Sequence, residues 1–208
     1  MKTNSVFPHQ KLPRDLRDAA SGSNLGNLPE WDLTHLYSAE DSPVLTRDLS
    51  WLNEECINFA KDYENKLAGL SANEMLECIV RYEKIQSISG RIMSFAGLRY
   101  YQITTDANRA KFIADMQGQI TDFSTPLVFF SLEMNCLNDD VLQKMLASNA
   151  DLARYKPVLD RMRAMKPYQL SNEMEKFLHD QSVVGATAWN RLFDETCAAL
   201  EFDVDGQI

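Results

Sequence analysis

The sequence predicts an all-α fold: an antiparallel bundle of about seven helices, followed by the beginning of a short β-strand at the C-terminus. Three observations predict it. Apolar residues recur at steps of three and four along most of the chain. Residues that cap helices stand at the ends of these stretches. The 208 residues include only eight glycines and seven prolines, too few for the many tight turns of a β-sandwich.

Residues 1–27 are polar and show no helical or strand periodicity. They contain Pro8, Pro13 and a run of small and polar residues at 19–27. We therefore expect residues 1–27 to form a flexible N-terminal tail. The helical domain is expected to span residues 28–200.

The first two helices are expected in the segment from Ser42 to Phe95. Ser42 followed by Pro43 is typical of a helix start, and Gly69 is expected to end that helix. Ser71 and Glu74 form the pattern of a capping box, which opens the second helix. The apolar stripes consist of Leu45, Leu49, Leu52, Cys56, Phe59, Tyr63 and Leu67 in the first helix and of Met75, Ile79, Tyr82, Ile85, Ile88, Ile92 and Phe95 in the second.

A third apolar stripe follows Asp106, which is expected to cap it. The stripe runs from Ile113 to Leu137, and Pro126 inside it predicts a kink. Four shorter helices are expected to begin at Asn138, at residue 150, at Ser171 and at Gly185. Pro157 interrupts the second of these, and the last one carries Trp189, Leu192, Phe193 and Leu200. Short connections between helices imply antiparallel neighbours.

The last eight residues, 201–208, change to strand periodicity. Phe202 and Val204 alternate with polar residues, and Asp205-Gly206 is a strong hairpin signal. The chain ends two residues later, so a second strand has no length. We therefore expect residues 201–208 to begin a truncated catalytic domain that continues in a longer polypeptide; a frayed tail is the alternative.

Charge and composition exclude several classes of protein. Lys and Arg total 21 against 30 Asp and Glu, and the net charge of −9 disfavours binding to nucleic acid. No run of 18 apolar residues could span a membrane, and the N-terminus lacks the apolar segment of a signal peptide. The four cysteines are scattered, and we expect mostly buried, reduced thiols of a cytoplasmic protein: Cys56, Cys78, Cys136 and Cys197.

Local spacing assembles no catalytic or metal site in this chain. A helical zinc motif needs two histidines four residues apart, and His9, His35 and His179 contain no such pair. Ser182 lies three residues after His179, but no nucleophile signature surrounds it or Cys197, and Ser182 is expected to end or cap a helix.

The carboxylate pairs and aromatic residues are expected to be structural. Consecutive helical residues point about 100° apart, so solvated faces or caps explain Glu54-Glu55 and Asp139-Asp140. Asp203 and Asp205 lack the downstream glutamate of a calcium loop. Core or rim positions, rather than ligand platforms, are expected for Tyr100, Tyr101 and Trp189.

The segment from Arg154 to Lys166 is the one basic stretch, and Asp160 is its only acid. Leu152, Tyr155, Leu159 and Met162 fit a buried stripe, which leaves the cations outside. The stretch is either a solvated helix face or a cleft wall that attracts acidic groups or a peptide carboxylate.

Four segments resemble oligoendopeptidase F, a family of bacterial thimet-type zinc peptidases. They are residues 28–37, 152–157, 169–178 and 185–196. The match is closest in the last segment, where Trp189, Asn190, Arg191, Leu192 and Phe193 stand as in the family. The resemblance covers about residues 28 to 208.

This resemblance implies a mostly helical zinc metallo-endopeptidase whose N-terminal helical domain forms one wall of a deep channel for oligopeptides. The H-E-x-x-H motif and a further glutamate ligand belong to the later part of the family's chain, which is absent here. No catalytic or metal residue is therefore carried over, the substrate-binding residues stay unknown, and the 208-residue chain alone is predicted to bind no zinc and to be inactive. The alternative is a free-standing helical module that binds a peptide or protein partner.

Overall fold

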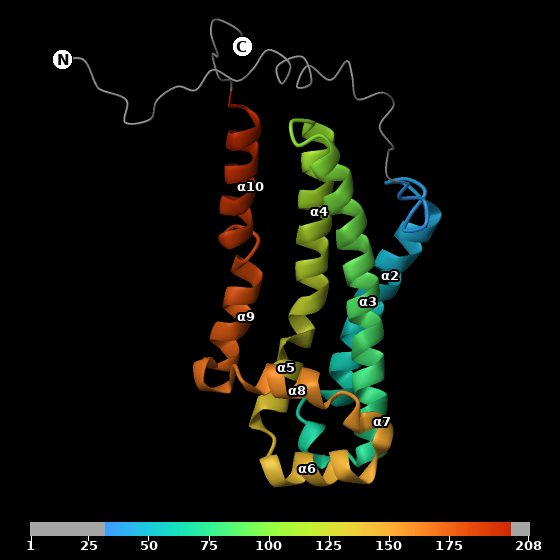
Figure 1. Cartoon of the computed structure of the whole chain (residues 1–208), viewed down its shortest axis with the longest axis vertical. Coiled ribbons are helices and arrows are strands. Elements are labelled where there is room, and N and C mark those ends of the chain that lie inside the picture. The colour runs from blue at the N-terminus through green and yellow to red at the C-terminus, as the bar shows by residue number, and fades with distance from the viewer. Residues whose placement is uncertain (1–31, 201–208) are drawn as a thin grey trace, which may run out of the picture. The chain divides into compact units, whose positions relative to one another are not determined.

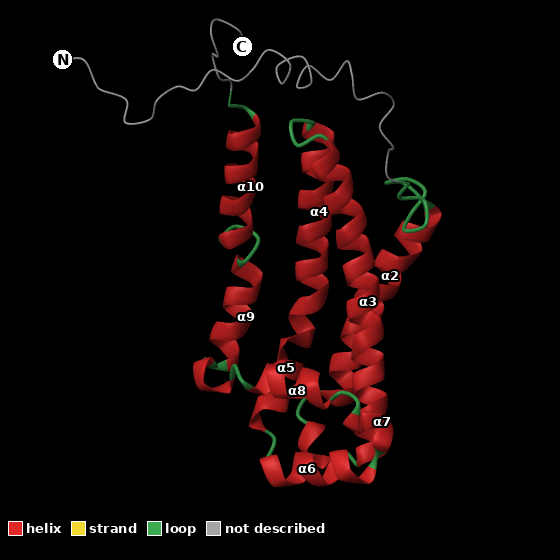
Figure 2. Cartoon of the chain, viewed as in Figure 1, coloured by secondary structure: helices red, strands yellow, loops and turns green. Residues whose placement is uncertain are grey.

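The computed structural model describes residues 32–200, and every regular element within them is a helix (Figures 1 and 2). The chain divides into two units, residues 1–33 and 34–208, and all the elements described below belong to the second. The all-α prediction is confirmed for this part of the chain. The tail predicted for residues 1–27 and the strand predicted for residues 201–208 lie outside the described residues.

The helices occur in the order predicted from their caps and apolar stripes. Their bounds are α2 (Pro43–Tyr63), η1 (Leu67–Gly69), α3 (Ala72–Gln102), α4 (Ala107–Ser124), η2 (Thr125–Leu127), α5 (Val128–Cys136), α6 (Asp139–Ser148), α7 (Ala150–Ala153), α8 (Lys156–Arg163), η3 (Lys166–Tyr168), α9 (Asn172–Gln181) and α10 (Ala186–Ala198). The side chains of the predicted capping residues accept hydrogen bonds from the first helical turns: Ser42, Ser71, Asp106, Asn138 and Ser171.

Two of the seven predicted segments are each split at a proline. Pro126 lies in the 3-10 turn η2, which separates α4 from α5, so the predicted kink is confirmed. Pro157 stands in the first turn of α8, directly after the break that ends α7. Proline has no N–H to donate to the preceding helical turn, whereas the N–H groups of a first turn need no such partner. Each helix therefore breaks just before its proline, which then lies in the first turn of the next element.

The end of the first helix differs from the prediction. Helix α2 ends at Tyr63 rather than at Gly69, and Asn65 turns the chain with a left-handed φ of 64°. The Glu133 side chain on α5 completes this turn: Oε1 accepts from the Asn65 amide at 2.5 Å and Oε2 from the Leu67 amide at 3.4 Å. The partner lies 68 residues along the chain, so local spacing could not indicate it.

Helices α2, α3 and α4 lie side by side, and consecutive helices run in opposite directions (Figure 1). At one end of this bundle the ring of Phe59, fully buried on α2, is surrounded by other rings. Its centroid lies 4.9–5.9 Å from those of Tyr63, Tyr82, Phe129 and Phe130. This aromatic cluster joins α2, α3 and α5 in one core.

A buried polar triad joins the segment before α2 to α2 and α3. Tyr37 Oη donates a hydrogen bond to Asp48 Oδ2 at 2.9 Å. Arg91 donates to the same Asp48 carboxylate, and its Nε donates to Tyr37 Oη at 3.0 Å. Burial opposes the charge of Asp48, but hydrogen bonds from Tyr37, Arg47 and Arg91 outweigh it, so the net pKa of this carboxyl is lowered. Burial is also the main cause that raises the pKa of Tyr37 to about 12.

The cysteines divide into two classes. Cys56 and Cys78 are buried, and burial raises the pKa of the first thiol to about 11 and of the second to about 12. Cys136 and Cys197 are exposed, so the prediction of mostly buried thiols is right for only half of them. All four are free thiols.

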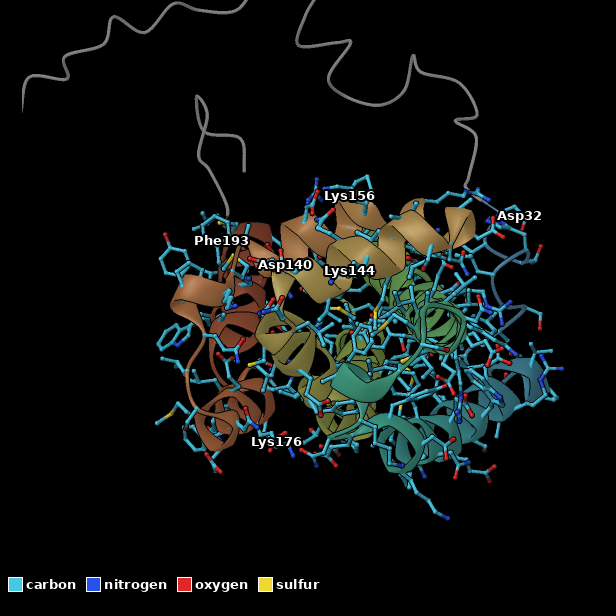
Figure 3. All side chains as sticks on the ribbon, turned by 90° about the horizontal axis from the view of Figure 1, so that it is seen from below. Asp32, Asp140, Lys144, Lys156, Lys176 and Phe193 are labelled. Carbon is cyan, nitrogen blue, oxygen red and sulfur yellow. The ribbon has the colours of Figure 1, made fainter. Side chains whose placement is uncertain are left out.

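The C-terminal helices α9 and α10 carry apolar side chains that face solvent. Helix α9 packs against α4, η2 and α5, whereas α10 has no buried residue. Trp189 on α10 is 69% exposed, and Phe193 lies at the edge of the unit, away from α2 and α3 (Figure 3). Of the three residues expected at core or rim positions, Tyr100 lies in the core, whereas Tyr101 and Trp189 are exposed and lie outside it.

Candidate functional site

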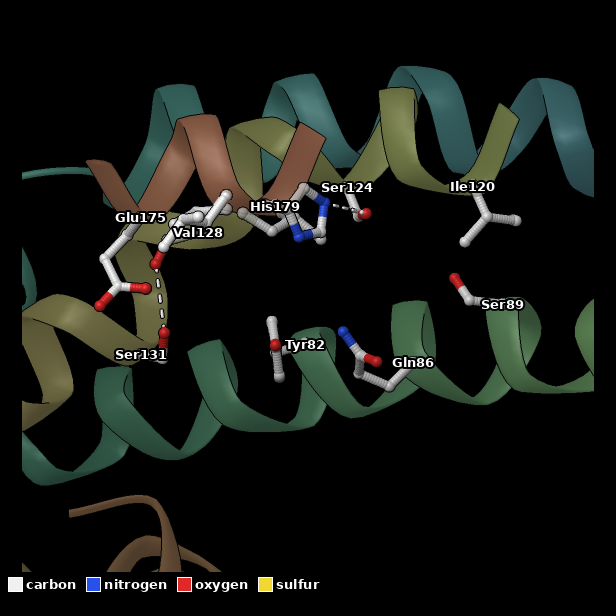
Figure 4. Close-up of a pocket in the computed structure, with 11 residues that line it drawn as sticks. Tyr82, Gln86, Ser89, Ile120, Ser124, Val128, Ser131, Glu175 and His179 are labelled. Atoms are coloured by element: carbon white, nitrogen blue, oxygen red, sulfur yellow. Dashed lines mark hydrogen bonds between the residues drawn. The ribbon is translucent and has the colours of Figure 1, made fainter. Parts of the chain in front are cut away.

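The candidate site is a cavity of about 480 Å³ between α3, the α4–α5 segment and α9 (Figure 4). Most of its lining is polar and combines hydroxyl, amide, carboxylate and imidazole groups from Tyr82, Gln86, Ser89, Ser124, Ser131, Glu175 and His179. Four apolar side chains complete it: Ile120, Leu127, Val128 and Leu178.

Helical spacing explains why these side chains meet. Residues 82, 86 and 89 of α3 lie four and three apart, and therefore on one face of the helix. Residues 175, 178 and 179 of α9 share a face for the same reason. Ser171 caps α9, and the Glu175 carboxylate accepts a hydrogen bond from the Leu170 amide at 2.8 Å. These two contacts fix where α9 begins, and therefore which of its residues face the cavity.

His179 fastens α9 to the end of α4. Its Nε2 lies 3.0 Å from Ser124 Oγ and 3.3 Å from the carbonyl oxygen of Thr121. Ser124 Oγ also lies 3.1 Å from that carbonyl and donates to it, and the imidazole tautomer decides which of Ser124 and His179 donates in their mutual contact. The neighbouring Asp180 accepts a hydrogen bond from Thr125 at 2.5 Å. These contacts hold α9 against the end of α4, and the described partners of the imidazole are Ser124 and a backbone carbonyl rather than the carboxylate that orients the base of a hydrolytic triad.

The cavity presents both hydrogen-bond donors and acceptors to a polar ligand. Burial raises the pKa of Tyr82, so its hydroxyl stays protonated at neutral pH. The serine hydroxyls and the Gln86 amide can each donate and accept. Such groups match the alternating donors and acceptors of a peptide main chain.

The other residues weighed from the sequence are dispersed. Ser182 caps the end of α9, as predicted: its amide donates to the carbonyl oxygen of His179 at 3.1 Å, while the His179 imidazole contacts Ser124. Cys197 is exposed on α10, and His35 is exposed before α2. Glu55 pairs with Arg81, and Asp139 opens α6 and pairs with Arg163. His9, Asp203 and Asp205 lie outside the described residues.

One cation of the basic stretch is not solvated. Arg163 donates to the carbonyl oxygens of Met134 and Leu137, the second at 2.7 Å, and so satisfies the last turn of α5. Its side chain is only 11% exposed, which corrects the expectation of an outward-facing cation. Lys156 follows the prediction and points to solvent (Figure 3).

No group of three or more His, Cys, Asp or Glu side chains between residues 32 and 200 is arranged to hold a metal ion. No helix in this range is long and apolar enough to cross a bilayer. The pairing of Ser124 with His179 was missed by sequence reasoning because 55 residues separate them. The available signal was Pro126, which marks the end of α4 where this contact forms.

Comparison with known proteins gives matches over most of the chain. Residues 133–202 match the model of a family described as Oligopeptidase F. The chain is 24% identical over 171 residues to group B oligopeptidase PepB of Streptococcus agalactiae serotype III (strain NEM316), which covers 80% of this chain and 27% of that protein. It is 22% identical over 161 residues to oligopeptidase PepF of Bacillus subtilis (strain 168), and this match covers 77% of this chain and 23% of that protein. The chain thus spans about a quarter of the length of these relatives. No solved structure matches it.

Proposed function

The chain resembles the N-terminal region of an oligoendopeptidase F-type protein, and from this premise we propose that residues 28–200 are the helical N-terminal domain of a zinc-dependent metallo-oligopeptidase. This domain forms one wall of the channel in which oligopeptides are cut. A narrow channel admits short, unfolded peptides and excludes folded proteins. In this proposal the enzyme acts in the cytoplasm on oligopeptides. Neither nucleic acid nor a membrane is one of its partners.

The observation that carries the proposal is the extent of the similarity. It covers about four fifths of this chain but only about a quarter of each relative, and both relatives are named oligopeptidases. No described group of side chains fits a zinc ion, so the residues between 32 and 200 take no catalytic role in this proposal. We assign zinc and the catalytic residues to the part of the enzyme that residues 201–208 begin.

We expect the purified 208-residue chain to cleave no peptide. A quenched fluorescent oligopeptide should stay intact in the presence of added zinc, because no described side chains assemble a metal site. Cleavage that a chelator abolishes would contradict the proposal. Oligopeptidase PepF serves as the positive control.

Inactivity would also fit the alternative, a free-standing helical module that binds a peptide or partner helix in a groove such as the cavity of Figure 4. The nucleotide sequence after the codon for Ile208 separates the two. An in-frame H-E-x-x-H supports the peptidase domain, and a stop codon supports the module.

The exposed face of α9 and α10 supports the same proposal and gives a further prediction. Phe177, Trp189 and Phe193 are each more than half exposed, and they lie in the segment that matches the family. Large exposed apolar patches mark surfaces that another part of a protein covers. We expect the isolated chain to bind the dye ANS strongly or to self-associate.

Replacing two of these residues, in Trp189→Ser with Phe193→Ser, should reduce ANS fluorescence by about half or more. The matched control replaces two scattered exposed residues of α2, in Val44→Ser with Ile57→Ser, and should change it little. A monomeric chain that binds no dye at high concentration would count against a covered face.

A further inference from the structure

A second surface feature, which we call the α3 groove, runs along another face of α3. It consists of two hollows of about 600 Å³ each that share Val80 and Glu83. One hollow is bordered by Arg47 of α2, with Lys84 and Arg91 of α3, and the other by Val158 of α8. Positions 80 and 84 precede 82 and 86 by two residues, about 200° around a helix, so the groove and the cavity lie on opposite sides of α3.

The end of the groove next to α2 carries one more cation than acids. Arg47, Lys84 and Arg91 line it together with two acids, Asp48 and Glu83. Both acids already accept hydrogen bonds: Asp48 is only 5% exposed and belongs to the buried triad, and Glu83 accepts from the Tyr155 hydroxyl at 2.6 Å.

Lys84 is the cation best placed for a ligand. Its Nζ lies 4.9 Å from the centroid of the Trp51 ring and forms no ion pair with any residue that the structure describes. Arg47 is an exposed side chain whose carboxylate partner, Asp48, also has Tyr37 and Arg91 as donors. An incoming carboxylate can therefore pair with Lys84 and Arg47 without leaving a buried acid unpaired.

The other end of the groove is apolar. Val80 is 47% exposed and Val158 is 59% exposed, and with Leu76 they line the hollow between α3 and α8. Arg154 and Asp151 border this hollow as a weak pair, 4.0 Å apart and solvent-exposed. This surface favours an aliphatic side chain of a ligand.

We propose that the α3 groove binds an acidic peptide, with carboxylate groups between Arg47 and Lys84 and an aliphatic side chain over Val80 and Val158. The inference is independent of the proposed peptidase function. Local charge and the apolar half select the peptide: Lys84 and Arg47 attract carboxylates, and the surface formed by Leu76, Val80 and Val158 favours aliphatic side chains, which a nucleic acid lacks. Arg154 and Tyr155, which belong to the basic stretch, line the apolar end of the groove. Under this proposal part of that stretch is a cleft wall rather than a solvated helix face.

The test is fluorescence anisotropy with a fluorescein-labelled peptide, Gly-Leu-Val-Leu-Asp-Glu-Glu, added to the purified chain at low ionic strength. We expect saturable binding that weakens with salt. The double substitution Lys84→Gln with Arg47→Gln should raise the Kd about fivefold or more, and Val80→Ser should also raise it. Each substituted residue is solvent-exposed, so the fold is retained, and thermal unfolding checks this.

The matched controls remove the same charges elsewhere, in Lys144→Gln on α6 with Arg161→Gln on α8, and should leave the Kd within about twofold. A neutral peptide with Asn and Gln in place of the acids and an amidated end should bind weakly. Absence of binding, equal binding of the neutral peptide, or equal weakening by the control substitutions would overturn the proposal. Competition by a short single-stranded DNA as effective as that by unlabelled peptide would overturn it too.

Discussion

Phe59→Ala is expected to lower the free energy of unfolding by about 3–5 kcal/mol, because it removes a whole aromatic ring from the core and leaves a cavity. The ring is 0% exposed and contacts four others, from α2, α3 and α5. The Arg81 guanidinium, 5.7 Å from its centroid, loses a contact as well. Urea unfolding followed by circular dichroism measures the change, and Tm should fall by about 6–20 °C.

The control for this substitution is Ile57→Ala, two residues away on the same helix. Ile57 is 55% exposed, so its removal should cost less than about 0.5 kcal/mol. If Phe59→Ala unfolds the chain entirely, Phe59→Leu, which leaves a smaller void, gives a graded loss instead. Equal stabilities of the Phe59 and Ile57 variants would show that the aromatic cluster does not hold the core.

Arg91→Leu is expected to cost about 2–4 kcal/mol at neutral pH. It removes one donor from the buried carboxylate of Asp48 and one from the Tyr37 hydroxyl, and a buried charge with missing partners is costly. This cost is smaller than the roughly 3–5 kcal/mol of a fully buried pair, because Arg91 is 37% exposed and Arg47 still pairs with Asp48 in the variant. Arg99→Leu is the matched control on the same helix: its partner Glu40 is 33% exposed, against 7% for Asp48, so breaking this pair should cost about 0–1 kcal/mol.

The effect of Arg91→Leu depends on pH in a defined direction. Folding lowers the pKa of Asp48, so its stabilising contribution is fully present above the unfolded pKa of about 3.9 and is lost as the pH falls through the folded pKa. The stability difference between wild type and Arg91→Leu should therefore be constant near neutral pH and shrink below about pH 4. Urea unfolding at several pH values measures it. A difference that stays unchanged in acid would show that Asp48 is not the group concerned.

The parts of the fold that the sequence predicted correctly are local. Ser71 and Asp106 cap helices through amides two or three residues away, and Pro126 breaks a helix through its own ring, so neighbouring letters suffice. The end of α2 was placed wrongly because a glutamate on α5 stabilises the turn at Asn65.

The candidate site and the Tyr37–Asp48–Arg91 triad were beyond local reasoning for the same reason. The Ser124–His179 contact spans 55 residues, and the Arg91–Asp48 pair spans 43. Periodicity correctly predicted that α10 has an apolar face, but it cannot tell whether another element covers that face. Trp189 is therefore exposed in a helix whose pattern resembles that of a buried one.

The contact between Glu133 and the turn after α2 has a consequence for the order in which the chain assembles. The α2–α3 hairpin is otherwise built from neighbours in sequence, which form contacts early and quickly. Its turn, however, has amides at Asn65 and Leu67 that donate to the Glu133 side chain of α5. On a ribosome the hairpin would emerge long before its final partner, and its tip would take up the native geometry only when Glu133 arrives.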